Sequence, residues 1–525
     1  MQQIEIFDST LRDGAQSESV SFSVEDKLNI VRALDQLGIS FIEAGNPHSN
    51  PKDAEFFRRA GELRLTHAKL AAFGSTRRRG VSASEDKNCA ALLEAGTKWV
   101  VLFGKSSRWQ VQEVLGATPE ENLEMIFDTV RFFVQADRQV IFDAEHFFDG
   151  YKQDPYYAEL ALRTAREAGA CRLVLCDTNG GCFPDEIGTI TGRMTALFPG
   201  RVGIHCHDDI GCAVAGAVAA VAAGAVQVQG TCTGFGERCG NTNLSTVIAN
   251  LQLKRGYRCI PEDRISRLTR TARYVSEVSN MHLSHAMPYV GKSAFAHKGG
   301  MHVDGVKKNP AAFEHIDPEQ VGNQRQILLS EVSGRAALLA KVHEFVPGLS
   351  KHSPELEVLV EKLKELEYQG YQFEAATASF EMVVLKELGR FTPFFEVELF
   401  RIIGEQDSAN RHMASAMVKL RVGDRFEITA DEGDGPVHAL DRALRKALEV
   451  FYPSLGGVRL TDYKVRVMDS KATAALVRVL IESSDGENVW TTVGVSTDII
   501  NASMRALCDS MEYKLYRDLA LNAPG

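Results

Sequence analysis

The sequence predicts a closed parallel (β/α)8 barrel, followed by helical linker subdomains and a C-terminal α+β domain. Eight short β-branched or aliphatic runs occur within the first 250 residues, and a stretch with helical spacing follows each run. An open doubly wound sheet is the competing fold, but eight strands is the number that closes a barrel. We place the barrel at 1–285, the linker at 286–379 and the C-terminal domain at 380–525.

The predicted strands share an apolar body and a polar carboxyl end. In chain order they are IEIFDS (4–9), FIEAGN (41–46), KLAAFG (69–74), WVVLFG (99–104), VIFDAE (140–145), RLVLCDT (172–178), VGIHCHD (202–208) and AVQVQGT (225–231). The first helix, within SVEDKLNIVRALDQLG, has Ser23 as its N-cap, acidic residues in its first turn and Gly38 at its end. This alternation favours a parallel sheet covered by helices.

The pattern changes after residue 250. A mainly helical stretch runs to about 287, and FAHKGGMHVDGVKKNP and a helical region with SPELEVLVEKLKELEYQGYQFE follow it. From about 380, two predicted helices lie among four alternating segments. The segments are FFEVELFRIIGE, SAMVKLRVGDRFEITA, DYKVRVMD and TAALVRVLIESSD, and the helices are HALDRALRKALEVFY and TDIINASMRALCDSMEYKLYRDL. We expect two similar halves of strands and a helix.

Composition excludes several classes of function. The 525 residues carry a net charge of −10 with both signs interspersed, which argues against binding of nucleic acid or an anionic membrane. No apolar run approaches the roughly 20 residues of a membrane span. The N-terminus lacks the pattern of a signal peptide, so we expect a cytoplasmic protein. The ten cysteines include no CxxC pair and are expected to be buried, reduced thiols.

Two histidines end the seventh predicted strand. Alternation along a strand turns His205 and His207 to one face and Cys206 to the other. Asp13 follows the first strand and should reach the same rim, because barrel active sites lie at the carboxyl ends of the strands. A His₂Asp set suits Zn²⁺, Mn²⁺, Co²⁺ or Mg²⁺ acting as a Lewis acid on a carbonyl. The alternative is a hydrogen-bonded polar pair.

Other polar residues should converge on the same rim. Arg12 could hold a carboxylate or a developing oxyanion, or could pair with Glu43 or Glu145. Glu145 could transfer protons, or could form a buried salt bridge. GFGERCGNTN matches no phosphate-binding fingerprint, so its glycines should let the loop pack near the metal while Asn241 points inward.

Two further groups complete the candidate set. Thr178 places a hydroxyl at the end of the sixth strand. His302, in AHKGGMH, lies outside the barrel strands and suits a mobile lid that delivers a base, unless it is a surface histidine.

Four motifs carry a resemblance to a known family. DSTLRDGAQ, GIHCHDD, GFGERCGNTN and FAHKGGMHVDG resemble the motifs of the acyl-CoA-condensing, aldolase-like TIM barrels, the 2-isopropylmalate, homocitrate and citramalate synthases. GDGPVHALDRAL and TTVGVSTDIINASMRAL resemble the allosteric domain of the isopropylmalate and citramalate synthases. FSVEDKL, SNPKD, VIFDAEHFFDGYK and LKELEYQGYQFEAA are most similar to the citramalate branch.

The resemblance implies an activity. Its members condense acetyl-CoA with a 2-oxo acid, here pyruvate, which would give (R)-citramalate and free CoA on a route to isoleucine. The alternatives are 2-oxoisovalerate and 2-oxoglutarate as the oxo acid, or a lyase running the reverse reaction. A metal-dependent hydrolase barrel is disfavoured because its HxH pair typically follows strand one, and an amino-acid sensor is disfavoured by the intact rim.

The resemblance also implies roles for residues and partners. By motif, Asp13, His205, His207 and Asn241 would hold the divalent metal, and Arg12 and Thr178 would meet the oxo acid. Glu145 takes the place of the family's catalytic glutamate and His302 that of its lid histidine, and which of the two is the base stays open. Asp143 stands where some citramalate synthases have a tyrosine facing pyruvate. By their place at the ends of the third and fourth strands, Phe73 and Phe103 would close the pocket around a methyl group, unless they are core residues. We expect a homodimer with isoleucine as effector of the C-terminal domain.

Overall fold

The computed structural model describes most of the chain. The described residues are 2–298, 300–327, 353–373, 376–406, 412–468, 475–486 and 488–522, with 342, 343, 346 and 349. They form two compact units, one of Met1–Ala296 with Glu314–Gln326 and one of His297–Phe313 with Ile327–Gly525. Residues 328–341, which belong to the predicted linker at 286–379, lie outside the described residues.

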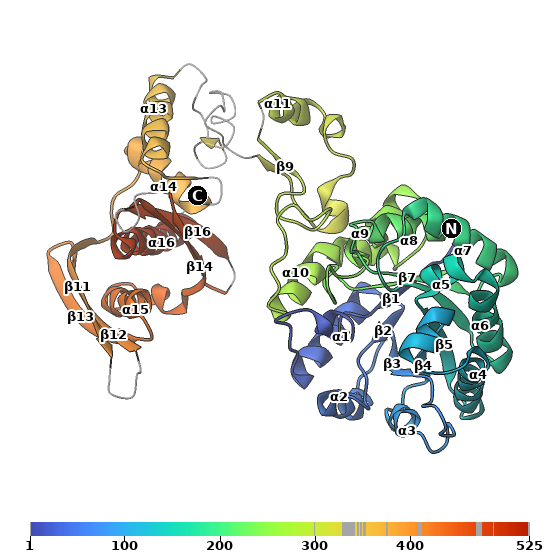
Figure 1. The fold of residues 1–525 in the computed structure, drawn as a ribbon. Coiled ribbons are helices and arrows are strands. Elements are labelled where there is room, and N and C mark those ends of the chain that lie inside the picture. The colour runs from blue at the N-terminus through green and yellow to red at the C-terminus, as the bar shows by residue number, and fades with distance from the viewer. Residues whose placement is uncertain are drawn as a thin grey trace. The chain divides into compact units, whose positions relative to one another are not determined.

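The first unit contains a closed barrel of eight parallel strands in sequential order, as predicted (Figure 1). The strands are β1 (Glu5–Asp8), β2 (Phe41–Glu43), β3 (Lys69–Ser75), β4 (Trp99–Lys105), β5 (Gln139–Glu145), β6 (Arg172–Asp177), β7 (Val202–Cys206) and β8 (Gln227–Gly230). Strand β8 pairs with β1 and closes the ring, so the open doubly wound sheet is excluded.

Helices surround the barrel (Figure 1). They are α1 (Val24–Leu37), α2 (Pro51–Ala60), α3 (Lys87–Glu94), α4 (Pro119–Gln135), α5 (Phe147–Gln153), α6 (Pro155–Ala168), α7 (Pro184–Leu197), α8 (Ala213–Ala222), α9 (Leu244–Ala249) and α10 (Leu268–Val278). Ser23 caps α1 and Gly38 ends it in the left-handed region, as the sequence predicts. The predicted helical stretch to 287 is less regular, since α10 ends at Val278.

The interior of the barrel is apolar at its base and polar at its carboxyl end. Phe7, Phe41, Val101, Ile141 and Val174 belong to one buried cluster. Side chains two residues further along each strand face the same way and form the next layer. This next layer carries polar residues of the rim, so the apolar cluster lies directly beneath the candidate site.

The part of the second unit that precedes the C-terminal domain is mainly helical. Its N-terminal part holds α11 (Gly300–Lys308), and the chain changes units at β9 (Ala296–His297) and β10 (Gln326–Ile327). Helices α13 (Pro354–Tyr368) and α14 (Thr377–Glu387) come next. Residues 379 and 380, between which we place the sequence-based domain boundary, lie inside α14.

The C-terminal domain is built from two similar halves, as expected. The first half comprises β11 (Glu396–Gln406), β12 (His412–Val422), β13 (Arg425–Gly433) and α15 (Pro436–Glu449). The second half comprises β14 (Arg459–Val467), β15 (Val477–Ser484), β16 (Val489–Ser496) and α16 (Ile499–Asn522). Each half is a three-stranded antiparallel sheet with one helix packed on it.

Two details of this domain differ from the sequence prediction. SAMVKLRVGDRFEITA is a hairpin, because Val422 pairs with Arg425 across a tight turn in which Gly423 has φ +58°. Strand β16 was missed. Its Gly494 allows close packing of α16, since a Cβ there would lie 2.0 Å from the carbonyl oxygen of Ala502.

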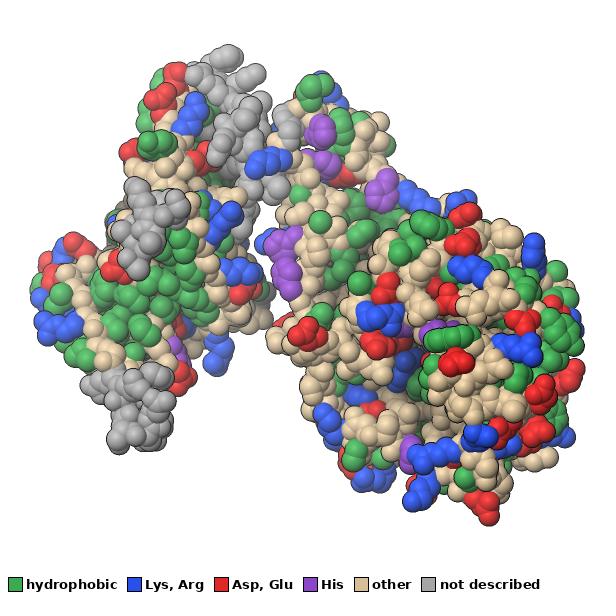
Figure 2. Space-filling model, in the orientation of Figure 1, with side chains coloured by type: hydrophobic (Ala, Val, Ile, Leu, Met, Phe, Trp, Pro, Cys, Tyr) green, Lys and Arg blue, Asp and Glu red, His purple; other side chains and the backbone are tan. Residues whose placement is uncertain are grey.

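The surface and the cysteines agree largely with the composition. On the face of the barrel unit shown in Figure 2, basic and acidic side chains are interspersed. Six of the ten free cysteines are buried, but Cys239 is exposed, which corrects the expectation for that residue because it lies in a surface loop. Among the described residues, no helix is long and apolar enough to cross a membrane.

Candidate active site

A cavity of about 210 Å³ opens at the carboxyl end of the barrel. Nine of the residues singled out from the sequence line it, namely Arg12, Asp13, Phe73, Phe103, Asp143, Glu145, Thr178, His205 and His207. Gln16, Cys176 and Glu237 complete the lining. Asn241 lies directly beside it through hydrogen bonds described below.

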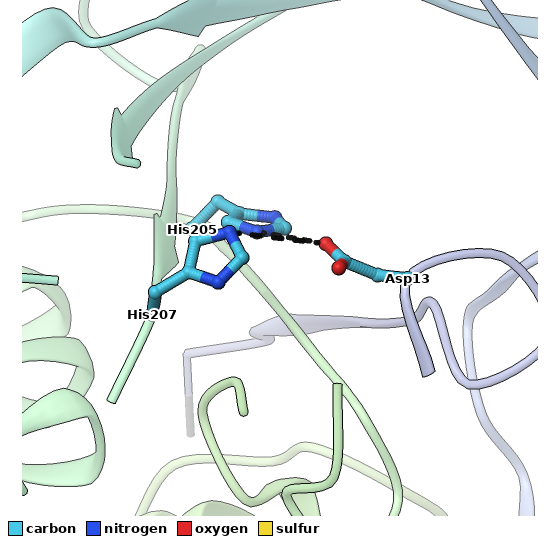
Figure 3. A group of neighbouring side chains, drawn as sticks. All are labelled: Asp13, His205 and His207. Carbon is cyan, nitrogen blue, oxygen red and sulfur yellow. Dashed lines mark ion pairs between the residues drawn. The ribbon is translucent and has the colours of Figure 1, made fainter. Parts of the chain in front are cut away.

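Asp13, His205 and His207 form a buried cluster (Figure 3). Asp13 Oδ2 lies 3.4 Å from His205 Nε2 and 4.0 Å from His207 Nε2. One potential ligand atom from each residue lies within 4.8 Å of the others. The two imidazoles come from the end of β7 and the residue after it, and the carboxylate comes from the loop after β1.

Local backbone structure places Asn241 against this cluster. Residues His207 and Asn241 form an antiparallel bridge, and Asn241 Nδ2 lies 3.2 Å from both Asp13 Oδ2 and His205 Nε2. Gly236 is required for this approach, because a Cβ there would lie 1.9 Å from Asn241 Oδ1. The glycine-rich loop therefore packs closely on the cluster, as its sequence suggests.

The charges of the cluster reinforce one another. Burial acts to raise the pKa of Asp13, but the charge of Arg12, followed by His205, holds that pKa well below its usual range. Burial acts to lower the pKa of His205, but the hydrogen bond and charge of Asp13 raise it. Burial, followed by the charge of His205, lowers the pKa of His207 to about 4, so this ring is neutral at pH 7.

The donor set fits a divalent cation. Asp13 Oδ1, His207 Nδ1 and Asn241 Oδ1 are buried and have no hydrogen-bond partner within the described residues. Unpaired polar atoms cost free energy when buried, so their concentration in one place indicates a site built for another group. Two imidazoles and a carboxylate with open positions are a common ligand set for divalent transition metals.

Arg12 connects the metal cluster with the aromatic wall. Its Nε lies 2.7 Å from Glu43 Oε2, its Nη1 lies 3.2 Å from Asp13 Oδ2, and its Cζ lies 3.9 Å above the Phe73 ring. Phe73 stacks on Phe103 with 5.2 Å between ring centroids. The predicted pairing with Glu43 is therefore present, and it fixes the guanidinium at the edge of the cavity.

Glu145 pairs with a residue that the sequence analysis missed. Lys105 Nζ lies 2.6 Å from Glu145 Oε2. The pair is partly exposed at the cavity wall, where a quarter of the Glu145 side chain remains accessible. Thr178 Oγ1 accepts a hydrogen bond of 2.8 Å from the backbone N–H of His146, which has a left-handed φ of +56°. Residue 146 thus turns the chain sharply after Glu145.

Two predicted residues have surroundings that the sequence does not indicate. Asp143 accepts a hydrogen bond from Gln229, and burial, followed by the charge of Glu43, raises the pKa of Asp143 to about 7. His302 is exposed on α11 in the second unit, with its ring stacked on Phe313 at 4.3 Å. The lid role of His302 therefore stays a prediction.

Comparison with known families follows the division of the chain. Residues 3–275 match the HMGL-like family model, residues 289–370 match a homocitrate synthase post-HMGL domain-like model, and residues 374–515 match the LeuA allosteric (dimerisation) domain. An (R)-citramalate synthase of Aquifex aeolicus is 50% identical over 520 residues, which cover 98% of both chains. The chain belongs to the (R)-citramalate synthase family.

Other relatives agree with this assignment. An (R)-citramalate synthase of Geobacter sulfurreducens is 47% identical over 98% of both chains. A probable 2-isopropylmalate synthase of Methanopyrus kandleri is 33% identical over 96% of both chains. The chain therefore shares the architecture of the wider group, and its sequence is more similar to these members of the (R)-citramalate synthase family.

Proposed function

We propose that this chain is an (R)-citramalate synthase that joins the acetyl group of acetyl-CoA to pyruvate and releases free CoA. The full-length identity of 43–50% to five proteins with that name carries the proposal. The cavity supports it, because a cation site, a fixed guanidinium and a carboxylate meet around a space of about 210 Å³. The reaction places the enzyme in cytoplasmic isoleucine biosynthesis.

Asp13, His205 and His207, with Asn241 beside them, would hold a divalent ion such as Mn²⁺, Mg²⁺, Zn²⁺ or Co²⁺. When bound, the ion supplies Lewis acidity that polarises the keto group of the oxo acid. Arg12 donates hydrogen bonds to developing negative charge at the cavity edge, where its pairs with Glu43 and Asp13 keep it oriented. The Thr178 hydroxyl contacts the oxo acid from the end of β6.

Glu145 and His302 are the two candidates for the base that transfers the proton. One of them removes a proton from the acetyl methyl group, and the resulting carbanion attacks C2 of pyruvate. Lys105 holds the Glu145 carboxylate in place through its ion pair of 2.6 Å. Water then cleaves the thioester, which gives a carboxylate and the CoA thiol.

Product identification tests the proposed function. The purified chain receives Mn²⁺, acetyl-CoA and an equimolar mixture of pyruvate, 2-oxobutanoate, 2-oxoisovalerate and 2-oxoglutarate. Free thiol is measured with a colorimetric reagent, and products are measured by chiral chromatography with mass detection. We expect (R)-citramalate to dominate. Dominant 2-isopropylmalate or homocitrate would assign the chain to another synthase, and an absence of thiol release would contradict the enzyme.

The Phe103→Ala substitution should relax the choice of oxo acid. Phe103 lines the cavity and stacks on Phe73, so its loss opens room beside the methyl group of pyruvate. One methylene is worth about 1–3 kcal/mol in an apolar pocket, so the kcat/KM ratio of 2-oxobutanoate to pyruvate should rise about tenfold. Phe127→Ala, an exposed phenylalanine on α4, serves as control. An unchanged ratio would remove Phe103 from the specificity wall.

The C-terminal domain offers a site for the expected isoleucine effector. A cavity of about 590 Å³ lies between α15 and β14, with apolar lining from residues such as Val437, Val458 and Leu460. Asp441 and Arg445 provide opposite charges at the same cavity, and Arg445 Nη1 is buried without a partner among the described residues. A branched aliphatic amino acid would match this combination, with its carboxylate at Arg445.

Arg445→Met should therefore weaken inhibition by isoleucine. We expect the isoleucine concentration for half-maximal inhibition to rise at least tenfold, because a charge-assisted hydrogen bond of about 1.5–3 kcal/mol is lost. The rate without isoleucine should stay unchanged. Arg442→Met on the same helix, which pairs with Asp431 at the surface, is the matched control. Equal inhibition of both variants would place the effector elsewhere.

Assembly is the last part of the proposal. We propose a homodimer, because residues 374–515 match a domain model described as a dimerisation domain.

A further inference from the structure

His205 is connected to Asp143 through one buried glutamine. His205 Nδ1 lies 2.9 Å from Gln229 Oε1, and Gln229 Nε2 donates a hydrogen bond of 3.1 Å to Asp143 Oδ1. Gln229 is fully buried, and Asp143 and His205 are 3% and 5% exposed. The chain of contacts crosses the barrel interior from β7 through β8 to β5. Its members come from residues far apart in the sequence, yet β7 and β8 place His205 and Gln229 directly opposite.

The direction of these hydrogen bonds selects one form of the His205 ring. The amide nitrogen of Gln229 faces Asp143 Oδ1 as a donor, and the amide oxygen of Gln229 faces His205 Nδ1. That oxygen can only accept, which places the ring proton on Nδ1. Nε2, which lies 3.4 Å from Asp13 Oδ2 and 3.2 Å from Asn241 Nδ2, is then the nitrogen that gives up its proton on Lewis-acid binding and offers its lone pair to the cation site.

We propose that Gln229 and Asp143 are positioning residues that hold His205 in its metal-ligating tautomer. The proposal rests on the metal site proposed above. A histidine binds a metal through one neutral nitrogen, and the hydrogen bond at its other nitrogen sets the tautomer and the ring orientation. Gln229 is fully buried between its two partners, so a reversed amide would turn its N–H donor toward the N–H donor of His205 Nδ1 and lose that hydrogen bond.

Metal affinity provides the test. Binding of Mn²⁺ is measured by calorimetry, and the absorption spectrum of the Co²⁺ form reports ligand geometry. Gln229→Met removes both hydrogen bonds at similar side-chain volume, and Asp143→Asn allows the Gln229 amide to take either orientation. Loss of such a partner typically weakens metal binding about 10- to 100-fold. We expect this loss for Gln229→Met, a smaller loss for Asp143→Asn, and an altered Co²⁺ spectrum for both.

A rescue and a control separate positioning from folding. Gln229→Glu alone places two carboxyl groups together and should weaken Mn²⁺ binding. Gln229→Glu combined with Asp143→Asn should restore it, because the new carboxylate accepts from both His205 and the new amide. Gln227→Met is the control, since Gln227 is equally buried on β8 but donates to Glu5 at the far end of the strand.

The outcomes are distinct. Mn²⁺ affinities of the Gln229 and Asp143 variants that equal the wild-type value, or a double variant that binds no better than Gln229→Glu, would overturn the positioning role. An equal loss for Gln227→Met would assign the effect to general destabilisation and would also overturn it. Failure of the unmodified chain to bind Mn²⁺ or Co²⁺ would overturn the metal site and this proposal together.

Discussion

His207→Ala is expected to reduce thiol release from acetyl-CoA and pyruvate about 1000-fold. The substitution removes one of two imidazoles from the proposed cation site, and Lewis-acid stabilisation of this kind is worth several kcal/mol. The ring is neutral at pH 7 because its pKa is lowered to about 4, so a ligand nitrogen is present throughout the neutral range in the unmodified chain. Metal content after dialysis, measured by mass spectrometry, should fall in parallel.

Cys206→Ala is the matched control for this experiment. Cys206 lies between the two histidines but faces away from them, toward Gly216 of α8. It is buried to the same degree, so its truncation tests whether any loss of packing at this strand end abolishes activity. We expect its activity within a fewfold of the unmodified chain. Turnover near the unmodified rate in His207→Ala would remove the histidine from the metal site.

Arg12→Lys is expected to lower kcat/KM about 100- to 1000-fold, although the positive charge is kept. The guanidinium contacts Glu43, Asp13 and the Phe73 ring at once, and a single ammonium group cannot meet all three. Removal of one preorganised donor to developing charge typically costs this factor. Steady-state kinetics with pyruvate as the varied substrate measures it.

Arg12→Lys should also lower stability, because Glu43 is fully buried and Arg12 is its ion-pair partner. The double variant Arg12→Gln with Glu43→Gln leaves no unpaired buried carboxylate from Glu43. Its thermal midpoint should lie closer to that of the unmodified chain than the midpoint of Arg12→Lys does, while its activity stays low. Recovery of activity together with stability would show that Arg12 acts only in folding.

The cluster of Asp13, His205 and His207 could be predicted from sequence because its signals are local. Alternation along one strand places His205 and His207 on one face, and the topology of a barrel brings the carboxyl end of β1 to the same rim. The second rule predicts that Asp13, which follows the first strand, lies near the two histidines. The barrel itself follows from strand runs that are each bounded by a helical pattern.

The partners of the site residues were missed because they depend on strand register. Lys105 ends β4, where a lysine usually signals exposure to solvent, yet the register of β4 and β5 places it opposite Glu145. Gln229 looks like an ordinary strand residue, and its partner Asp143 lies 86 residues away in the chain. Register is set by packing around the whole ring, which no short segment encodes.

The linker helices have a consequence for dissecting the chain. Residues of α13 and α14, among them Leu359, Phe380 and Val384, share one buried cluster with Val493 and Val495 of β16. Ser379 Oγ also accepts a hydrogen bond of 2.9 Å from the backbone N–H of Val493. Proteolysis or truncation after residue 379 would therefore divide a single cooperative folding unit and expose apolar surface on both products. Val342 and Val346 belong to the same cluster, so a cut before Ser353 would divide it as well.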